Sequence, residues 1–245
     1  MSTMKSVRLI QKVANRFGVD IREYRPERSG FGRLSLMLKH HDISLVLDVG
    51  ANIGQFARSL REAGYAKRIV SFEPLSKPHQ QLLQASQSDS QWDIAPQTAI
   101  GDRNGELEMH ISGNSLSSSA LDMLESHKAA APNSAYVGTE QVPLATLDTL
   151  AGTYLQPTTI PFLKIDTQGY EDRVLDGASS LLAKARGLHI ELSFVPLYEG
   201  QKLYDDMVRR LQSMGFTIWS IAPGFCDPHS GRMLQVDATF FRTGS

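Results

Sequence analysis

Short apolar segments alternate with amphipathic segments along most of the chain. Apolar runs of about five residues are typical of strands buried on both faces, and the segments between them have the three- and four-residue spacing of helices. Strands that alternate with helices form a parallel sheet covered on both faces. The sequence therefore predicts one doubly wound α/β domain. The predicted strands are Leu45–Val49, Arg68–Phe72, a segment within Trp92–Ile100, Thr159–Ile165, Gly187–Leu192, Phe216–Ile221 and Val236–Phe241. The predicted helices are Leu34–His40, Gly54–Ala63, Pro78–Ser86, Glu171–Ala183 and Lys202–Met214.

Two regions depart from this alternation. Near the N-terminus, Val7, Ile10, Val13, Ala14 and Phe17 form the stripe of an amphipathic helix, which we expect to pack on the main domain. Residues 1–42 are therefore predicted to be a helical extension and residues 43–245 the main domain. The segment 112–138 is rich in Ser, Ala and Asn and is predicted to be an insertion or lid, preceded by a hairpin strand at Glu106–Ile111.

Composition and charge narrow the class of protein. The 25 Lys and Arg residues nearly balance the 26 Asp and Glu residues, so no basic surplus is available for a nucleic-acid backbone, and nucleic acid is not an expected partner. The single cysteine, Cys226, excludes an intramolecular disulfide. No apolar run approaches the roughly 20 residues that cross a bilayer, and no signal-peptide pattern is present, so we expect no transmembrane segment and a cytoplasmic location.

The segment after the first predicted strand has the pattern of a nucleotide-binding turn. Asp48 ends the strand, and Gly50 and Gly54 allow a tight turn in which a ligand approaches the backbone. Glu73 ends the second strand, 23 residues after Gly50, where a carboxylate can accept hydrogen bonds from ribose hydroxyls. A nucleotide-like ligand is expected at this sheet edge.

The turn favours S-adenosylmethionine over a dinucleotide. The sequence Gly50-Ala51-Asn52-Ile53-Gly54 lacks the middle glycine of the dinucleotide fingerprint. A carboxylate at Asp48 would repel a pyrophosphate but could accept from the ammonium of a methionine moiety. The alternatives are an NAD-dependent nucleotide-sugar oxidoreductase and a non-catalytic domain that keeps the fold as a binding partner.

Four ordered motifs resemble the FkbM family of methyltransferases. The likeness extends from about residue 45 to residue 242, and it implies the seven-stranded class I methyltransferase sheet with an antiparallel last strand. It also implies methyl transfer from S-adenosylmethionine to a hydroxyl of a sugar, glycan, glycolipid or secondary metabolite. The motifs are Asp48 to Gly54, Phe72-Glu73-Pro74, Ala99 to Gly105, and Leu163 to Glu171.

The resemblance also implies a set of cofactor-binding residues. The first motif would line the methionine side, Glu73 with Pro74 would hold the ribose, and the third motif would flank the adenine. Each has a structural alternative: glycines that serve only the turn, a helix cap at Asn52, and a type I turn at Asp102. The implied residues are Asp48, Gly50, Ala51, Asn52, Gly54, Glu73, Pro74, Ile100, Gly101 and Asp102.

Carboxylates near the ends of strands four and five are the candidate general bases. A protonated hydroxyl is a poor nucleophile, so a nearby carboxylate helps by removing its proton. Asp166 is the first candidate, followed by Glu171 and Glu191. The alternative for Glu171 is a first-turn acid that complements a helix dipole. Many family members carry glutamate where this chain has Gln168. No metal-binding spacing is present among these carboxylates, so no metal is expected.

Overall fold

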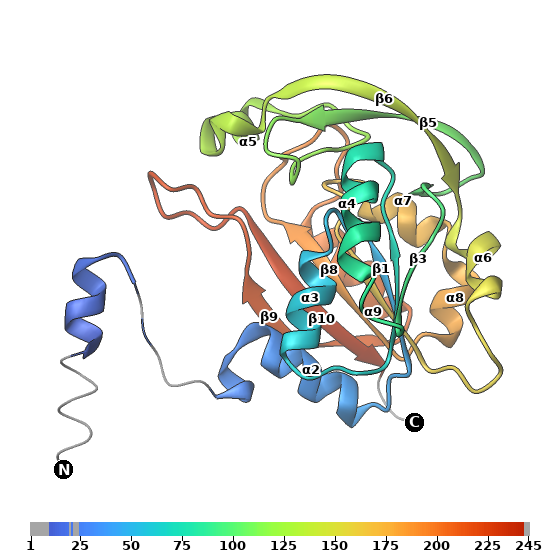
Figure 1. Ribbon diagram of the computed structural model, residues 1–245. Coiled ribbons are helices and arrows are strands. Elements are labelled where there is room, and N and C mark those ends of the chain that lie inside the picture. The colour runs from blue at the N-terminus through green and yellow to red at the C-terminus, as the bar shows by residue number, and fades with distance from the viewer. Residues whose placement is uncertain (1–9, 20, 22–24, 243–245) are drawn as a thin grey trace, which may run out of the picture.

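The computed structural model describes residues 10–19, 21 and 25–242. These residues form two sheets (Figure 1). The larger sheet has seven strands in the order β3-β2-β1-β7-β8-β10-β9, and the smaller has three in the order β4-β6-β5. The larger sheet is formed by β1 Leu45–Val49, β2 Arg68–Phe72, β3 Trp92–Ile94, β7 Pro161–Ile165, β8 Gly187–Ser193, β9 Phe216–Pro223 and β10 Gln235–Arg242. The smaller is formed by β4 Ala99–Ile100, β5 Gly105–Ser112 and β6 Tyr136–Ala145.

The larger sheet is parallel except at one edge. β1 pairs in parallel with both β2 and β7, and β10 pairs antiparallel with β8 and β9. This confirms the predicted doubly wound α/β class with its antiparallel last strand. The carboxyl ends of β1, β2 and β7 meet at one edge, which is where open α/β sheets bind ligands.

Helices cover both faces because alternate residues of each central strand point to opposite sides. Leu45, Leu47 and Val49 pack against the side that carries α7, α8 and α9, whereas Val46 packs toward α2 and α3. Fully burying each such side chain contributes roughly 1.5–3 kcal/mol. The main helices are α2 Gly30–His40, α3 Gln55–Glu62, α4 Ser76–Ser86, α7 Glu171–Asp176, α8 Ser179–Lys184 and α9 Tyr204–Ser213.

Several predicted elements differ in detail from the observed ones. The helix expected over 171–183 is divided into α7 and α8 at Gly177, where a Cβ would lie 1.9 Å from the carbonyl oxygen of Gly101. The strand expected within 92–100 is also divided, and its second part, β4, joins the smaller sheet. The hairpin strand expected at 106–111 is β5, and its partner β6 was not predicted from the sequence.

The smaller sheet arches over the carboxyl edge of the larger one (Figure 1). β5 and β6 are long antiparallel strands, and the segment between them carries α5 Glu125–Ala130. The remaining short helices are η1 Pro26–Arg28, η2 Pro132–Ser134, α6 Leu147–Leu150 and η3 Ala151–Thr153. The segment predicted as a lid therefore belongs to a roof built on this second sheet.

The predicted N-terminal helix lies partly outside the described residues. Residues 10–16 are helical, but the side chains of Ile10, Val13 and Phe17 are 55%, 50% and 81% exposed, so its stripe is not packed as expected. α2, by contrast, buries Leu34 and Leu38 in the main core. The boundary predicted at residue 42 stays a prediction. Within the described part of the chain, no helix combines the length and apolar character that crossing a bilayer requires.

Candidate active site

A cavity of about 380 Å³ lies at the carboxyl ends of β1, β2 and β7. The turn after β1 forms one wall, and Leu107 and Met109 of β5 line it from the roof. One end is lined by apolar side chains together with Glu73, and the other by polar and aromatic side chains. The cavity therefore has the position and the mixed lining of a binding site for an amphipathic small molecule.

The turn after β1 is held tightly between its neighbouring strands. The N–H groups of Gly50 and Ala51 both donate to the carbonyl oxygen of Phe72, at 3.1 and 3.0 Å. Gly50 has a φ of 74°, and a Cβ there would lie 1.8 Å from the carbonyl oxygen of Asp166. Only glycine fits this position. Gly54 has a φ of 88° and packs against the Trp92 ring, so it begins α3 without lining the cavity.

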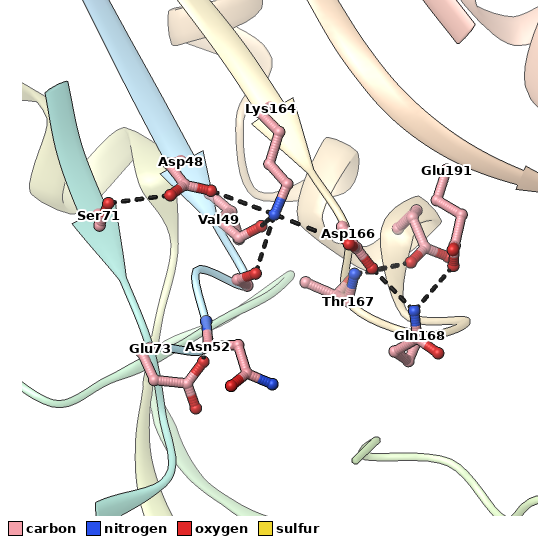
Figure 2. Close-up of polar contacts among 12 residues, drawn as sticks. Asp48, Val49, Asn52, Ser71, Glu73, Lys164, Asp166, Thr167, Gln168 and Glu191 are labelled. Carbon is pink, nitrogen blue, oxygen red and sulfur yellow. Dashed lines mark hydrogen bonds and ion pairs between the residues drawn. The ribbon is translucent and has the colours of Figure 1, made fainter. Parts of the chain in front are cut away.

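Glu73 lies in the cavity wall with both carboxylate oxygens held by backbone. Its Oε2 accepts from the Asn52 N–H at 2.8 Å, as the two residues lie in Figure 2. Its Oε1 accepts from the Leu75 N–H at 2.9 Å. The side chain is 5% exposed, and burial raises its pKa to about 7 despite these two hydrogen bonds. A ligand that donates hydrogen bonds to this carboxylate would stabilise its ionised form.

Asn52 offers a second acceptor to a ligand. Its backbone has a φ of 50°, a conformation in which asparagine is one of the better tolerated side chains. Its Nδ2 donates to the carbonyl oxygen of Ser115 at 2.9 Å, which connects the turn to the segment that covers the cavity. Its Oδ1 is buried and has no hydrogen-bond partner among the described residues. A buried acceptor in a cavity wall fits a ligand that carries ammonium or hydroxyl donors.

Asp48 points away from this cavity. It is fully buried, it does not line the cavity, and its Oδ2 accepts from the Ser71 hydroxyl at 2.9 Å (Figure 2). Its Oδ1 lies 3.1 Å from the Lys164 Nζ. The carboxylate that was expected to meet a methionine ammonium is therefore neutralised from within the protein, and only Glu73 of the two strand-end acids faces the cavity.

Lys164 connects β7 to the end of β1 and to the turn that follows it. Besides Asp48, its Nζ donates to the carbonyl oxygens of Gly50 at 2.9 Å and Val49 at 3.3 Å. Burial lowers the pKa of Lys164, but the carboxylates of Asp48 and Asp166 outweigh that effect and hold the pKa above its ordinary value. This ammonium is a fixed positive charge that joins β7 to the end of β1.

Asp166 is the most accessible carboxylate at the polar end. It lines the cavity, its side chain is 39% exposed, and its Oδ2 lies 3.8 Å from the Lys164 Nζ. Asp237 of β10 and His189 of β8 line the same end. Burial, reinforced by the charge of Asp166, raises the pKa of Asp237 to about 6. Burial and the charge of Lys164 lower the pKa of His189 to about 4, so this ring is neutral at neutral pH.

Glu191 lies behind Asp166 and is joined to it through an amide. The Gln168 Nε2 donates to the Asp166 Oδ1 at 2.8 Å and to the Glu191 Oε2 at 2.9 Å (Figure 2). Gln235 donates to the same Glu191 oxygen at 2.6 Å. Burial and the neighbouring carboxylates raise the pKa of Glu191 well above its ordinary value. Glu191 does not line the cavity, so contact with a substrate would require it to act through Gln168.

Glu171 is also buried outside the cavity lining. Its Oε1 accepts from the Thr167 N–H at 2.8 Å, and the Gly169 N–H lies 3.1 Å from each of its carboxylate oxygens. Burial raises its pKa to about 7. Glu171 therefore holds the loop that follows Asp166.

The third motif lies at the apolar end. Ile100 lines the cavity, as do Ala51 and Pro74 from the earlier motifs. Gly101 and Asp102 do not line it, and the Asp102 carboxylate is paired with Arg103 and Arg173 at 3.0 and 3.4 Å.

Several cavity residues were not identified from the sequence as site residues. Lys164 was visible as a lysine within an otherwise apolar strand, which signals a buried partner. Asp237 was not among the candidate bases. The ring contact between Phe31 and Phe56, with centroids 5.6 Å apart, joins α2 to α3 and gives no sequence signal. Within residues 10–19, 21 and 25–242, no group of three or more His, Cys, Asp or Glu side chains could hold a metal ion.

Comparisons with known proteins identify the domain. A model of the methyltransferase FkbM domain matches residues 48–218. No curated protein matches the chain.

Among solved structures, similar chains include an rRNA methylase from Streptococcus thermophilus (11% identity, 91% of this chain and 100% of that chain, TM-score 0.47). Magnesium protoporphyrin IX methyltransferase from Synechocystis, solved with bound S-adenosylmethionine, is 14% identical over 96% of each chain with a TM-score of 0.46. The 1,6-didemethyltoxoflavin-N1-methyltransferase from Burkholderia thailandensis, solved with bound 1,6-didemethyltoxoflavin and S-adenosylhomocysteine, is 12% identical over 92% of this chain and 94% of that chain, with a TM-score of 0.45. Likeness at this level carries no argument about the acceptor.

Proposed function

Because the chain belongs to the methyltransferase FkbM family, we propose that it transfers the methyl group of S-adenosylmethionine to a hydroxyl oxygen of a small-molecule or glycan acceptor. The chain is an S-adenosylmethionine-dependent methyltransferase, and the hydroxyl acceptor is our proposal. The observation that carries it is the accessible carboxylate of Asp166 at the polar end of the cavity.

We propose one orientation for the cofactor in the cavity. The ribose hydroxyls would donate to Glu73, and the adenine would lie among Pro74, Ile100 and Leu107. The methionine ammonium would meet the free Oδ1 of Asn52, since Asp48 is already paired. Gly50 and Ala51 would allow the close approach to the backbone that this placement needs.

When bound, the cofactor supplies an electrophilic methyl group on a positively charged sulfur. The polar end of the cavity then has to align an acceptor oxygen and take its proton. We assign the proton to Asp166, and Asp237 would accept a hydrogen bond from the acceptor beside it. Gln168 fixes the Asp166 carboxylate, and Glu191 and Glu171 would act by holding Gln168 and the 167–169 loop.

The experiment that tests this function uses a labelled methyl group and a chemical assignment of the product. The full chain is incubated with S-adenosylmethionine labelled in its methyl group and with fractions of polar metabolites, glycans and lipids. We expect label in a methyl ether, which survives mild alkali, whereas a methyl ester would be hydrolysed. Label found only on nitrogen, or in an alkali-labile ester, would contradict the hydroxyl acceptor.

Two variants separate the cofactor site from the proton acceptor. Glu73→Ala should lose S-adenosylhomocysteine binding while it stays folded. Asp166→Asn should bind S-adenosylhomocysteine normally but lose methyl transfer. Undiminished transfer by Asp166→Asn would move the base to another residue, with Asp237 next.

A further inference from the structure

The N-terminal helix ends in a defined cap. Residues 10–16 are helical, and Gly18 follows with a φ of 72°. The Val19 N–H donates to the Ala14 carbonyl at 3.0 Å, and the Gly18 N–H donates to the Asn15 carbonyl at 3.1 Å. These two bonds form the Schellman motif that terminates many helices. The Gln11 side chain also donates to the Ile21 carbonyl at 2.9 Å, so the chain after the cap returns toward the helix.

The apolar face of this helix is open. Ile10, Val13 and Phe17 are 55%, 50% and 81% exposed, and beyond the cap Val19 and Ile21 are 52% and 41% exposed. At about 100° per residue, Ile10, Val13 and Phe17 lie on one side of the helix. In Figure 1 this helix is the blue coil nearest the N-terminus, drawn apart from the body of the molecule. Its large apolar side chains therefore form a continuous exposed strip.

Basic residues flank the apolar strip on one side. Lys12 and Arg16 are four residues apart, and at about 100° per residue they lie roughly 100–160° around the helix from Ile10 and Phe17. In the sequence, the first 19 residues hold Lys5, Arg8, Lys12 and Arg16, and the first acidic residue is Asp20, although the whole chain has a net charge of −1. The basic surplus of this segment is therefore local.

We propose that residues 10–21 bind the surface of an anionic phospholipid membrane. The exposed apolar side chains would enter the boundary between headgroups and acyl chains, and Lys12 and Arg16 would stay among the headgroups. An apolar strip with Lys or Arg on the adjoining polar face is typical of helices that lie in the plane of a membrane surface.

Charge favours a membrane over the two other partners that could cover the apolar strip, which are a second copy of the chain and the chain's own core. A second copy of the same helix would bring Lys12 and Arg16 of both copies into one assembly, where like charges repel. Docking on the chain's own core would bury the apolar strip without using the basic surplus. An anionic bilayer would bury the apolar side chains and also attract Lys12 and Arg16, since basic residues near a membrane are attracted to negatively charged lipids.

In the sequence, residues 10–21 precede η1 and α2, and Phe31 in the first turn of α2 lines the cavity. Membrane binding by residues 10–21 would therefore keep the domain that carries the cavity close to the lipid surface. The binding itself does not depend on methyl transfer, so its test and the test of the proposed function are separate.

The test is flotation of the full chain with lipid vesicles, without cofactor or acceptor. We expect binding to vesicles that contain phosphatidylglycerol, little binding to phosphatidylcholine alone, and weakening by salt. Lys12→Glu with Arg16→Glu should lower the partition coefficient roughly 30-fold or more. The matched control reverses two exposed lysines elsewhere, Lys67→Glu with Lys184→Glu, and should retain most of the binding.

A second pair of variants tests the apolar strip. Val13→Ser with Phe17→Ser should abolish flotation, whereas Val137→Ser, a residue 72% exposed on β6, should not. Because these side chains lie outside the core, all variants should unfold at the temperature of the parent protein. Equal binding of the helix variants and their controls, or no binding to anionic vesicles, overturns the proposal. Loss of a dimer in the Val13 and Phe17 variant, or protection of residues 10–17 from hydrogen exchange without lipid, would assign the strip to a second copy or to the core and also overturn it.

Discussion

Lowering the pH from 8 to 5 should weaken cofactor binding because Glu73 becomes protonated. In the free protein, burial raises the pKa of this carboxyl to about 7, and both of its oxygens accept backbone hydrogen bonds. Ribose hydroxyls that donate to Glu73 would favour its ionised form, so the binding-competent protein is the fraction that has lost this proton. S-adenosylhomocysteine is the appropriate probe, since its groups do not titrate strongly in this range.

The size of the effect follows from the ionised fraction. The apparent Kd equals the intrinsic Kd divided by the fraction of competent protein, which is about one in ten at pH 6 and about one in a hundred at pH 5 for a pKa near 7. The Kd should therefore rise about tenfold from pH 8 to pH 6 and about 100-fold at pH 5. Between these limits the slope approaches one decade per pH unit.

Isothermal titration calorimetry across this range measures both the slope and the proton released. Glu73→Gln should bind more weakly at pH 8 and show a nearly flat profile. Glu171→Gln is the matched control, because Glu171 has the same raised pKa of about 7 but does not line the cavity. It should retain the slope.

A Kd that stays constant between pH 5.5 and pH 8 would refute the reasoning. So would a Glu73→Gln variant with the slope of the parent protein, because another group would then control the affinity. A slope lost only in Glu171→Gln would indicate that the 167–169 loop, and not the ribose site, is the titrating element.

Three further predictions concern stability. Lys164→Met should lower the unfolding free energy by about 3–5 kcal/mol in urea denaturation, because it leaves the Asp48 carboxylate buried without a partner. Adding Asp48→Asn should recover part of that loss. Equal stability of the single and double variants would contradict the pairing. Gly50→Ala should lower the midpoint temperature of thermal unfolding by more than Gly64→Ala does. Both glycines have a positive φ, but only Gly50 has a carbonyl oxygen 1.8 Å from the new Cβ. Glu171 should contribute to the unfolding free energy of the ligand-free protein, and this contribution should fall by on the order of 3 kcal/mol as the pH rises from about 4.5 to about 7. The reason is that the folded state keeps the Glu171 proton that the unfolded chain releases. Glu171→Gln should lack this contribution, and a variant with the same dependence of unfolding free energy on pH as the parent protein would refute the prediction.

The main sheet could be predicted from the sequence because its strands are short and apolar and its helices are amphipathic. The β1 and β2 boundaries agree with the predicted ranges, since β1 lies between Ser44 and Gly50 and β2 lies between Lys67 and Glu73. β6 could not be predicted in the same way. Its burial alternates weakly, and its stability comes from pairing with β5 and β4, which are distant in the sequence. Tertiary pairing of this kind leaves little local pattern.

The candidate site could be predicted in position but not in the direction of its side chains. The motif after β1 correctly located the turn, and Glu73 lines the cavity at the end of β2. Asp48 stands one residue before the end of β1, and its direction depends on Lys164 of β7, which pairs with it across the sheet. A sequence shows that both residues exist, but the partner of a buried charge is set by strand register.

The bond from the Asn52 amide to the Ser115 carbonyl has a consequence for turnover. It joins the turn after β1 to the segment that covers the cavity, and both residues line the cavity. A net hydrogen bond is worth about 1 kcal/mol, which corresponds to a broken bond in roughly one molecule in six. Release of S-adenosylhomocysteine between these two segments would therefore require the loss of one weak contact and no unfolding of the smaller sheet.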